Sequence, residues 1–169
     1  MKPTKFTHKN YILDHEPIRK NSVWPGHIVD FRYTSKNTGS DPRPLVFVVY
    51  RDIPKKLVHG VNLNYLTEFE VQKMFSFIRK IVPLNQEDKS ARTLSETTTR
   101  FDIDKKDEKI PTMIYERVIK PKILKAGKNN CYRTYSEDKI SSMRVIAYKI
   151  ESDFRNWKGR YSDEENKIK

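Results

Sequence analysis

The sequence predicts an α+β fold, a small and strongly bent antiparallel β-barrel of the SH3-like type with two or three added α-helices. Segments with the two-residue alternation of β-strands come first, and segments with the three-to-four-residue spacing of helices follow them. The first strands are separated by short turns, as in antiparallel hairpins. An open α+β sheet is the alternative that the same pattern allows.

Three strands are expected in the first half of the chain. Residues 27–33 alternate between apolar and polar side chains, which is typical of a half-buried strand. Residues 45–50 are a continuous β-branched and aromatic run, which indicates a strand buried on both faces. Residues 57–65 complete a hairpin with that run. A five-stranded barrel needs two more strands, and residues 96–103 and 131–135 are the candidates.

The third of these strands contains residues that strands usually avoid. Gly60, Asn62 and Asn64 alternate with apolar residues, so they are expected to share one face of the strand. A glycine there permits a bend or bulge where a small barrel must turn. The two asparagines are interpreted either as partner-binding groups or as groups that close local backbone hydrogen bonds.

Helical spacing begins after the third strand. Thr67 and Glu70 form a capping box, and the helix that follows is expected to end at Pro83. A second helix is expected from Pro111 to Ile119, ended or kinked by Pro121.

A third helix is expected from Ser136 as its N-cap, because apolar residues then repeat at three or four positions as far as Trp157. The predicted organisation is an extended N-terminal arm (1–25), a single barrel-plus-helices domain (26–158) with a charged loop at 85–111, and a charged C-terminal tail (159–169).

The net charge of +12 favours a polyanionic partner, either nucleic acid or an acidic protein surface. The excess is concentrated in residues 117–144, which hold eight basic and two acidic residues. A solvated face that serves only solubility is the alternative. Tyr132 and Tyr135 flank Arg133 and are expected either to stack on bases or to pack on the barrel. The candidate nucleic-acid-binding residues are Lys120, Lys122, Lys125, Lys128, Arg133, Lys139 and Arg144.

Several functional classes find no support in the sequence. No apolar run is long enough to span a membrane, and the N-terminal residues do not resemble a secretory signal. The single cysteine, Cys131, forms no internal disulfide, fits a reducing compartment and is expected to pack as a small apolar residue. The four histidines have no metal-ligand spacing, and no glycine-rich phosphate loop occurs. No catalytic residue, metal or cofactor is therefore predicted.

The stretch "PGHIVDFRYTSKNTGSDPRPLVFVVYRD" resembles the opening of plasmid toxin ribonucleases of the MazF/PemK type. The shared features are Gly-x-Ile-Val-x-Phe, a loop, and an Arg-Pro pair before an apolar strand. Such proteins are small barrels that cut single-stranded RNA without a metal ion. The resemblance maps one residue, Arg43, onto a catalytic role near the barrel mouth, and the serine/threonine segment that these enzymes need is not recognisable.

A broader stretch is similar to small proteins of large contractile-tailed bacteriophages. Its motifs are "GHIVDFRY", "RPLVFVVY", "VHGVNLNYL", "YERVIKPKIL" and "YRTYSEDKISSMRVI", within residues 26–146. The resemblance implies a virion or DNA-associated accessory protein without catalytic residues. Asn64 stands where a histidine is expected, so that position is not an obligate catalytic histidine.

These observations together predict a non-enzymatic phage structural or accessory protein at a DNA–protein or protein–protein junction. The expected partners are DNA or another polyanion, contacted through its backbone, and phage proteins, with no membrane. The expected partner-binding residues are Asn62, Asn64 and Arg43, and the expected location is the virion or the host cytoplasm. Two alternatives remain, a MazF-like metal-independent endoribonuclease and a virion subunit that does not contact nucleic acid.

Overall fold

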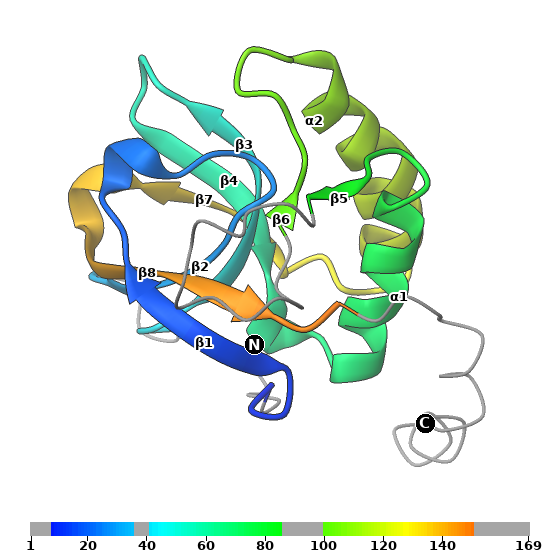
Figure 1. Cartoon of the computed structure of the whole chain (residues 1–169), viewed down its shortest axis with the longest axis horizontal. Helices are drawn as coiled ribbons and strands as arrows, with labels where there is room; N and C mark the ends of the chain where they lie inside the picture. The colour runs from blue at the N-terminus through cyan, green and yellow to red at the C-terminus, as the bar shows by residue number, and fades with distance from the viewer. Residues whose placement is uncertain (1–7, 36–40, 86–99, 151–169) are drawn as a thin grey trace.

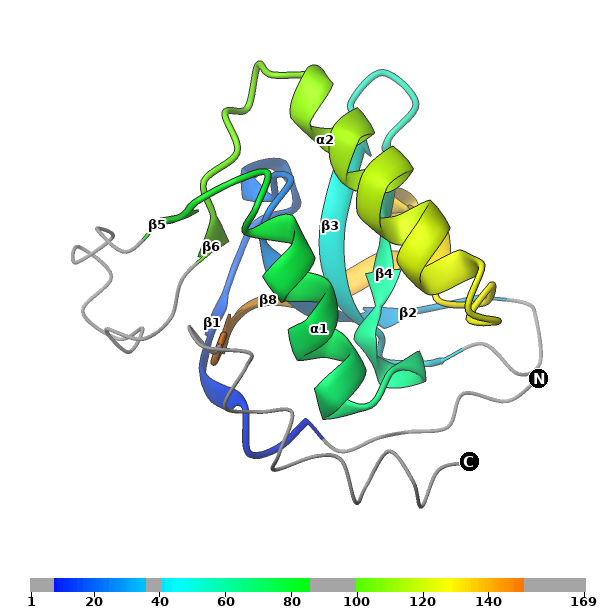
Figure 2. The same ribbon diagram turned by 90° about the vertical axis from the view of Figure 1, so that its right-hand side faces the viewer.

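The computed structural model describes residues 8–35, 41–85 and 100–150. Among these residues, six strands form one antiparallel sheet in the order β1-β8-β2-β3-β4-β7, and the helices lie over one face of it (Figure 1, Figure 2). The strands are β1 (Ile12–Pro17), β2 (Ile28–Tyr33), β3 (Leu45–Asp52), β4 (Leu57–Asn62), β7 (Tyr132–Ser136) and β8 (Ile140–Tyr148). The predicted α+β class is confirmed.

The sheet is open. β1 and β7 stand at its two edges, and no ladder joins them within the described residues, so a closed barrel is not shown. Of the two extra candidate strands, residues 131–135 correspond to β7, which pairs with β4. The other candidate, 96–103, contributes only β6 (Arg100–Phe101), which pairs with β5 (Leu84–Asn85) in a separate two-stranded ladder. Residues 86–99 of the predicted charged loop lie outside the described residues.

Part of the predicted N-terminal arm belongs to the sheet. β1 pairs with β8 through residues 12–17, and the preceding residues Tyr11 and His8 are 5% and 3% exposed. A 3-10 turn, η1 (Lys20–Ser22), then leads toward β2. Residues 1–7 of the arm and the predicted tail 159–169 lie outside the described part of the chain.

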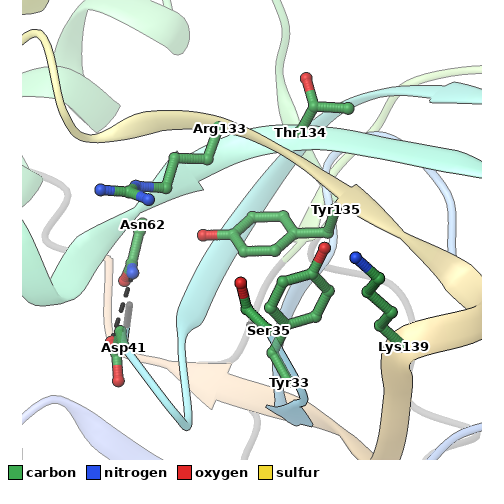
Figure 3. Close-up of a pocket in the computed structure, with 8 residues that line it drawn as sticks. All are labelled: Tyr33, Ser35, Asp41, Asn62, Arg133, Thr134, Tyr135 and Lys139. Carbon is green, nitrogen blue, oxygen red and sulfur yellow. Dashed lines mark hydrogen bonds between the residues drawn. The ribbon is translucent and has the colours of Figure 1, made fainter. Parts of the chain in front are cut away.

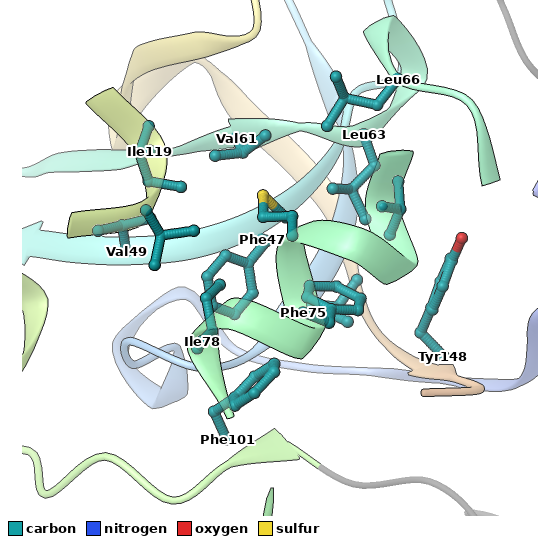
Figure 4. Packing of buried hydrophobic residues seen from close by; sticks show 14 of the residues in the cluster. Phe47, Val49, Val61, Leu63, Leu66, Phe75, Ile78, Phe101, Ile119 and Tyr148 are labelled. Atoms are coloured by element: carbon teal, nitrogen blue, oxygen red, sulfur yellow. The ribbon is translucent and has the colours of Figure 1, made fainter. Parts of the chain in front are cut away.

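Two apolar clusters lie on opposite faces of the sheet. The larger, the helix-covered core, packs Phe47, Val49 and Val61 of β3 and β4 against the helices (Figure 4). The smaller, the second core, holds Val46 and Val48 of β3 together with residues of β2, β7 and β8. Because successive residues of β3 enter different clusters, the prediction of a strand buried on both faces is confirmed.

The first helix, α1 (Glu68–Ile78), begins at the predicted capping box. The Glu70 amide donates to Thr67 Oγ1 (3.1 Å), and the Thr67 amide donates to Glu70 Oε1 (3.0 Å). These two bonds satisfy amides that the first turn of a helix leaves without partners. The helix ends before Pro83 is reached, and buried Val82 extends the apolar stripe past its end.

The second helical segment differs from its prediction at both ends. It begins earlier, as α2 (Lys109–Ile114), and it continues past Pro121 as a π-helix, η3 (Tyr115–Leu124). Proline cannot donate the amide hydrogen bond of a regular helix, so we expected it to end or kink the segment. The wider i→i+5 pattern of η3 accommodates Pro121 inside a helix, and the predicted end at Ile119 is wrong.

The predicted third helix is wrong, because Ser136 instead precedes a 3-10 turn, η4 (Glu137–Lys139), and then strand β8. The helix-like spacing comes from a bulge. Asp30 pairs with Arg144 and Arg32 pairs with Ser141, so β8 holds one extra residue there. Ser142 adopts φ of +52° at this point. The extra residue places Ile140 and Met143, three positions apart, in the same cluster. Phe154 and Trp157 lie outside the described residues.

The hairpin of β3 and β4 contains the predicted irregularity at Gly60. The register shifts between Val48 and Tyr50, opposite Gly60 and His59. A Cβ on Gly60 would collide with the Phe47 carbonyl oxygen and with a methyl group of Val46, so only glycine fits the close approach of β3. The strand is shorter than predicted. It ends at Asn62, and residues 63–65 form a 3-10 turn, η2 (Leu63–Tyr65), that holds Asn64 off the strand.

Candidate functional site

A polar pocket of about 280 Å³ lies beside β7. Its walls come from the end of β2, the residues that flank the β2–β3 loop, the end of β4, strand β7 and the turn η4 (Figure 3). The lining residues are Tyr33, Ser35, Asp41, Asn62, Arg133, Thr134, Tyr135 and Lys139.

Two tyrosine rings form the floor of this pocket. The rings of Tyr33 and Tyr135 meet edge to face with centroids 5.1 Å apart, and the Tyr135 ring also meets Phe31 in this way at 5.2 Å. The Tyr33 hydroxyl accepts a hydrogen bond from the Ser136 amide at 3.2 Å. Because Tyr135 belongs to the second core, the pocket opens on the side of the sheet away from the helices.

The Arg133 guanidinium is held in place by its surroundings. Its Nε donates to the Asn130 carbonyl oxygen at 2.8 Å, and its Nη2 donates to the Tyr65 hydroxyl at 3.0 Å. The guanidinium also lies over the Tyr65 ring, 5.1 Å from its centroid. A guanidinium carries five N–H donors. The bonds to Asn130 and Tyr65 use two of them, and the other three have no acceptor among the described residues.

Asp41 supplies the negative charge of the pocket, and its carboxylate is already engaged. One oxygen accepts from the Arg43 amide at 3.0 Å. The other accepts from the side-chain amides of Asn62 (3.2 Å) and Asn64 (2.6 Å). The side-chain oxygen of Asn62 also accepts from the backbone amide of Asn64 at 3.1 Å, and this bond caps the turn η2. The predicted partner-binding asparagines therefore close local hydrogen bonds, and Asn62 is fully buried.

The Tyr135 hydroxyl is the unusual group of the site. Tyr135 is 4% exposed, and its hydroxyl has no hydrogen-bond partner within the part of the chain that the structure describes. Burial raises the pKa of Tyr135 well above its ordinary value, with a smaller opposing effect from Arg133. The hydroxyl therefore keeps its proton at physiological pH. Buried polar groups are rarely left without a partner, so this one calls for an explanation.

The pocket brings together two of the seven predicted basic residues. Arg133 and Lys139 approach from opposite sides of the Tyr135 ring (Figure 3), and neither forms an ion pair with a described carboxylate. Lys139 belongs to the 3-10 turn η4 and not to the predicted α-helix. The Thr34 backbone amide donates to its carbonyl oxygen and fixes its backbone.

Four other predicted basic residues lie on η3 and the turn after it. Lys120 is 3.8 Å from Glu116 of the same helix, and Lys128 is 3.6 Å from Glu70 of α1. Lys122 lies over the Phe77 ring, 4.8 Å from its centroid. Lys125 is exposed just after the helix.

Arg144 and Arg43 are engaged with a buried carboxylate. Arg144 of β8 grips both oxygens of Asp30, with its Nε 2.9 Å from one of them. Arg43 Nη2 lies 3.2 Å from Asp30 as well. Asp30 is 8% exposed, so this cluster holds β2 against β8 and the start of β3. Arg43 does not line the pocket.

The described residues also bear on three other features, a metal site, a membrane span and a reactive cysteine. Within 8–35, 41–85 and 100–150, no group of histidine, cysteine and carboxylate side chains is arranged to hold a metal ion. No helix in the same ranges is both long enough and apolar enough to cross a bilayer. Cys131 is buried, and burial raises the pKa of its thiol to about 12. It packs as the small apolar residue that the sequence predicted.

The sequence did not single out most of the pocket. Tyr33, Ser35, Asp41 and Thr134 carried no signal of a shared site, because they come from segments far apart in the chain. Tyr135 lies close to Arg133 in the sequence, but an alternating Tyr-Arg-Thr-Tyr pattern fits packing and ligand binding equally well. The distinguishing property is the missing partner of its hydroxyl, and that depends on the folded structure.

No protein-family model, curated protein or solved structure matches this chain significantly.

Proposed function

We propose that the protein binds nucleic acid through the sugar-phosphate backbone, as a non-enzymatic accessory protein, in keeping with its resemblance to phage proteins. The observation that carries the proposal is the pocket beside β7, where Arg133 and Lys139 lack a carboxylate partner among the described residues. Cations that are not neutralised within the protein are the ones that replace counterions on a phosphate chain.

The rigid setting of Arg133 supports this function. Its guanidinium is fixed by the Asn130 carbonyl, the Tyr65 hydroxyl and the Tyr65 ring. A side chain that is already ordered loses less conformational entropy when it binds a phosphate. Lys139 is exposed, and it contributes a point charge.

The lysines of η3 and of the turn after it supply a second, longer-range contribution. Lys120 and Lys128 are partly balanced by Glu116 and Glu70 at distances near the limit of an ion pair. Exposed pairs of this kind are weak, worth about 0–1 kcal/mol, so both lysines can exchange their carboxylates for phosphates. Arg144 stays in its role as a partner of Asp30 and contributes less.

We also infer that the sheet is an opened form of the predicted SH3-like barrel. β7 leads through η4 directly into β8, which pairs with β2 at the far side of the β2-β3-β4-β7 meander. The second core lies inside this bend, and the contact of Tyr33 with Tyr135 bridges it. The pocket then corresponds to the mouth of the bent sheet.

Fluorescence anisotropy with labelled single-stranded and duplex DNA, at several salt concentrations, tests the function. We expect affinity to fall steeply with salt. The double variant Arg133→Gln/Lys139→Gln should weaken binding and reduce the slope of log K against log salt by about two. Lys73→Gln/Lys106→Gln removes the same charge from exposed positions outside the pocket and is the matched control.

Equal losses in the two double variants would point to a general charge effect and contradict a site at the pocket. The integrity of a single-stranded RNA, incubated in chelator, tests the non-enzymatic part. Cleavage that disappears in Arg43→Ala would favour the toxin-type ribonuclease. The absence of binding at low salt to every probe would leave a virion subunit that does not contact nucleic acid.

A further inference from the structure

The unpartnered hydroxyl of Tyr135 indicates what the pocket binds. A buried hydroxyl without a hydrogen bond destabilises the folded state, and a phenylalanine ring would fill the same space without that cost. The ring itself is well packed against Phe31 and Tyr33. The hydroxyl therefore contributes nothing to the packing of the described structure, and its position inside the pocket makes it available to a ligand.

The groups around this hydroxyl favour an acceptor-rich, negatively charged ligand. Figure 3 shows the hydroxyl directed toward the end of the pocket where Arg133 and Asn62 lie. Three N–H donors of Arg133 are not used by its bonds to Asn130 and Tyr65. The acceptor in the same wall, the Asp41 carboxylate, is occupied by three donors from its own loop and from Asn62 and Asn64.

We propose that this pocket receives a phosphate group of the bound nucleic acid, with the Tyr135 hydroxyl and the Arg133 guanidinium donating hydrogen bonds to its oxygens. The inference rests on the proposed nucleic-acid binding and assigns its central contact. Lys139, on the other side of the Tyr135 ring, meets the neighbouring stretch of the same strand. Arginine suits this position because its planar donors match the oxygens of a phosphate.

Tyr135→Phe is the decisive variant, because it removes one oxygen atom and no charge. We expect affinity for nucleic acid to fall about tenfold, the effect of losing a hydrogen bond to a charged group. The salt dependence should keep its slope, and the melting temperature should stay equal or rise, because an unsatisfied buried group is removed. Tyr50→Phe makes the same chemical change at a tyrosine that is 41% exposed, and it should alter nothing.

A second readout separates this inference from the proposed function. Pyrophosphate and a nucleoside monophosphate are titrated into the full chain at constant ionic strength, and the NMR signal of the Arg133 Nε–H group is followed. We expect a saturable shift that Tyr135→Phe weakens and Tyr50→Phe preserves. This probe reports on the pocket whether or not a long nucleic acid binds.

The outcomes are distinguishable. If nucleic acid binds but Tyr135→Phe leaves affinity and the Arg133 signal unchanged, the phosphate pocket is wrong and the proposed function survives. If nucleic acid does not bind while pyrophosphate shifts the signal in a Tyr135-dependent way, the function is wrong and the pocket serves a small phosphate ester. A Tyr135→Phe protein that binds weakly and also melts earlier would overturn the inference, because the hydroxyl would then be structural.

Discussion

Each face of the sheet buries a tyrosine hydroxyl, and the two hydroxyls differ in their hydrogen bonding. In the helix-covered core, the hydroxyl of fully buried Tyr148 is bonded to His8 Nδ1 at 2.8 Å. In the second core, the hydroxyl of Tyr135 has no partner among the described residues. The hydroxyl on one face therefore contributes a bond to the folded protein, while the hydroxyl on the other contributes none within the described residues. Stability and binding should therefore respond to different substitutions.

Truncation in the helix-covered core should give the largest effect. Phe75 is fully buried, and its ring lies 5.5 Å from Phe47 and 5.4 Å from Phe101, centroid to centroid. Phe75→Ala should lower the free energy of unfolding by about 3–5 kcal/mol, as large-to-small changes in cores do. Urea unfolding measures it, and Phe77→Ala, at a half-buried position of the same helix, should cost clearly less. Equal losses would contradict the assignment of Phe75 to the centre of this core.

A substitution at the close approach of β3 and β4 should come next. Gly60→Ala forces a methyl group against the Phe47 carbonyl and Val46, and we expect a loss of about 1–3 kcal/mol. Gly127→Ala is the control, because its surroundings are open and its φ of +89° isolates the cost of backbone conformation. Urea unfolding of both variants separates crowding from conformation. A stable Gly60→Ala protein would mean that the strands part easily at this point.

Tyr148 and Tyr135 differ in whether their buried hydroxyls have a hydrogen-bond partner. Tyr148→Phe removes the bond to His8 and should cost about 1 kcal/mol in the free energy of unfolding. Tyr135→Phe should cost nothing, because no bond is lost within the described structure. Thermal unfolding of the two variants side by side measures the contrast. Equal destabilisation would show that the two hydroxyls are not different in kind.

The pH dependence of stability should show the smallest effect, and it comes from the helix-covered side. Burial lowers the pKa of His8 below its ordinary value of 6.5. The Leu63 carbonyl oxygen lies 2.8 Å from His8 Nε2 and can only accept a hydrogen bond. Neutral His8 therefore carries its hydrogen on Nε2 and accepts from the Tyr148 hydroxyl at Nδ1. As the pH falls below 6.5, His8 takes up a proton in the unfolded chain before it does so in the folded chain. Stability should therefore decrease as the pH is lowered, until the pH passes the lowered pKa of His8 in the folded state.

His8→Gln should flatten this dependence between pH 7 and 5, while His15→Gln, at an exposed residue of β1, should leave it intact. Chemical denaturation at half-unit pH steps measures both. An unchanged slope in His8→Gln would assign the effect to other groups, including His59, whose pKa is also lowered by burial.

Local chemistry was enough to predict some elements. The capping box of α1 depends on two residues three positions apart, and the apolar run of β3 needs no partner to be recognised. β8 was mistaken for a helix because the bulge at Ser142 turns an alternating strand into a three-residue repeat. The π-helix around Pro121 was missed because a regular helix excludes proline. Both errors come from irregular backbone that local patterns do not encode.

The candidate site was predicted only in part, for a different reason. Arg133 and Lys139 were found because basic residues cluster along the chain. Arg144 was grouped with them, although its partner Asp30 lies 114 positions away. Asp41 and Tyr33 reach the pocket through loop and strand ends that meet only in the folded sheet. A count of basic residues along the sequence does not show which of them form ion pairs in the folded protein.

The position of β8 between β1 and β2 has a consequence for synthesis on the ribosome. β1 bonds to no strand but β8 among the described residues, and its last partner is Tyr148. β1 therefore leaves the ribosome before the other described strands, and its partner β8 is the last described strand to be made. Until then β1 and an edge of β2 carry unpaired backbone groups, which invite pairing with other chains.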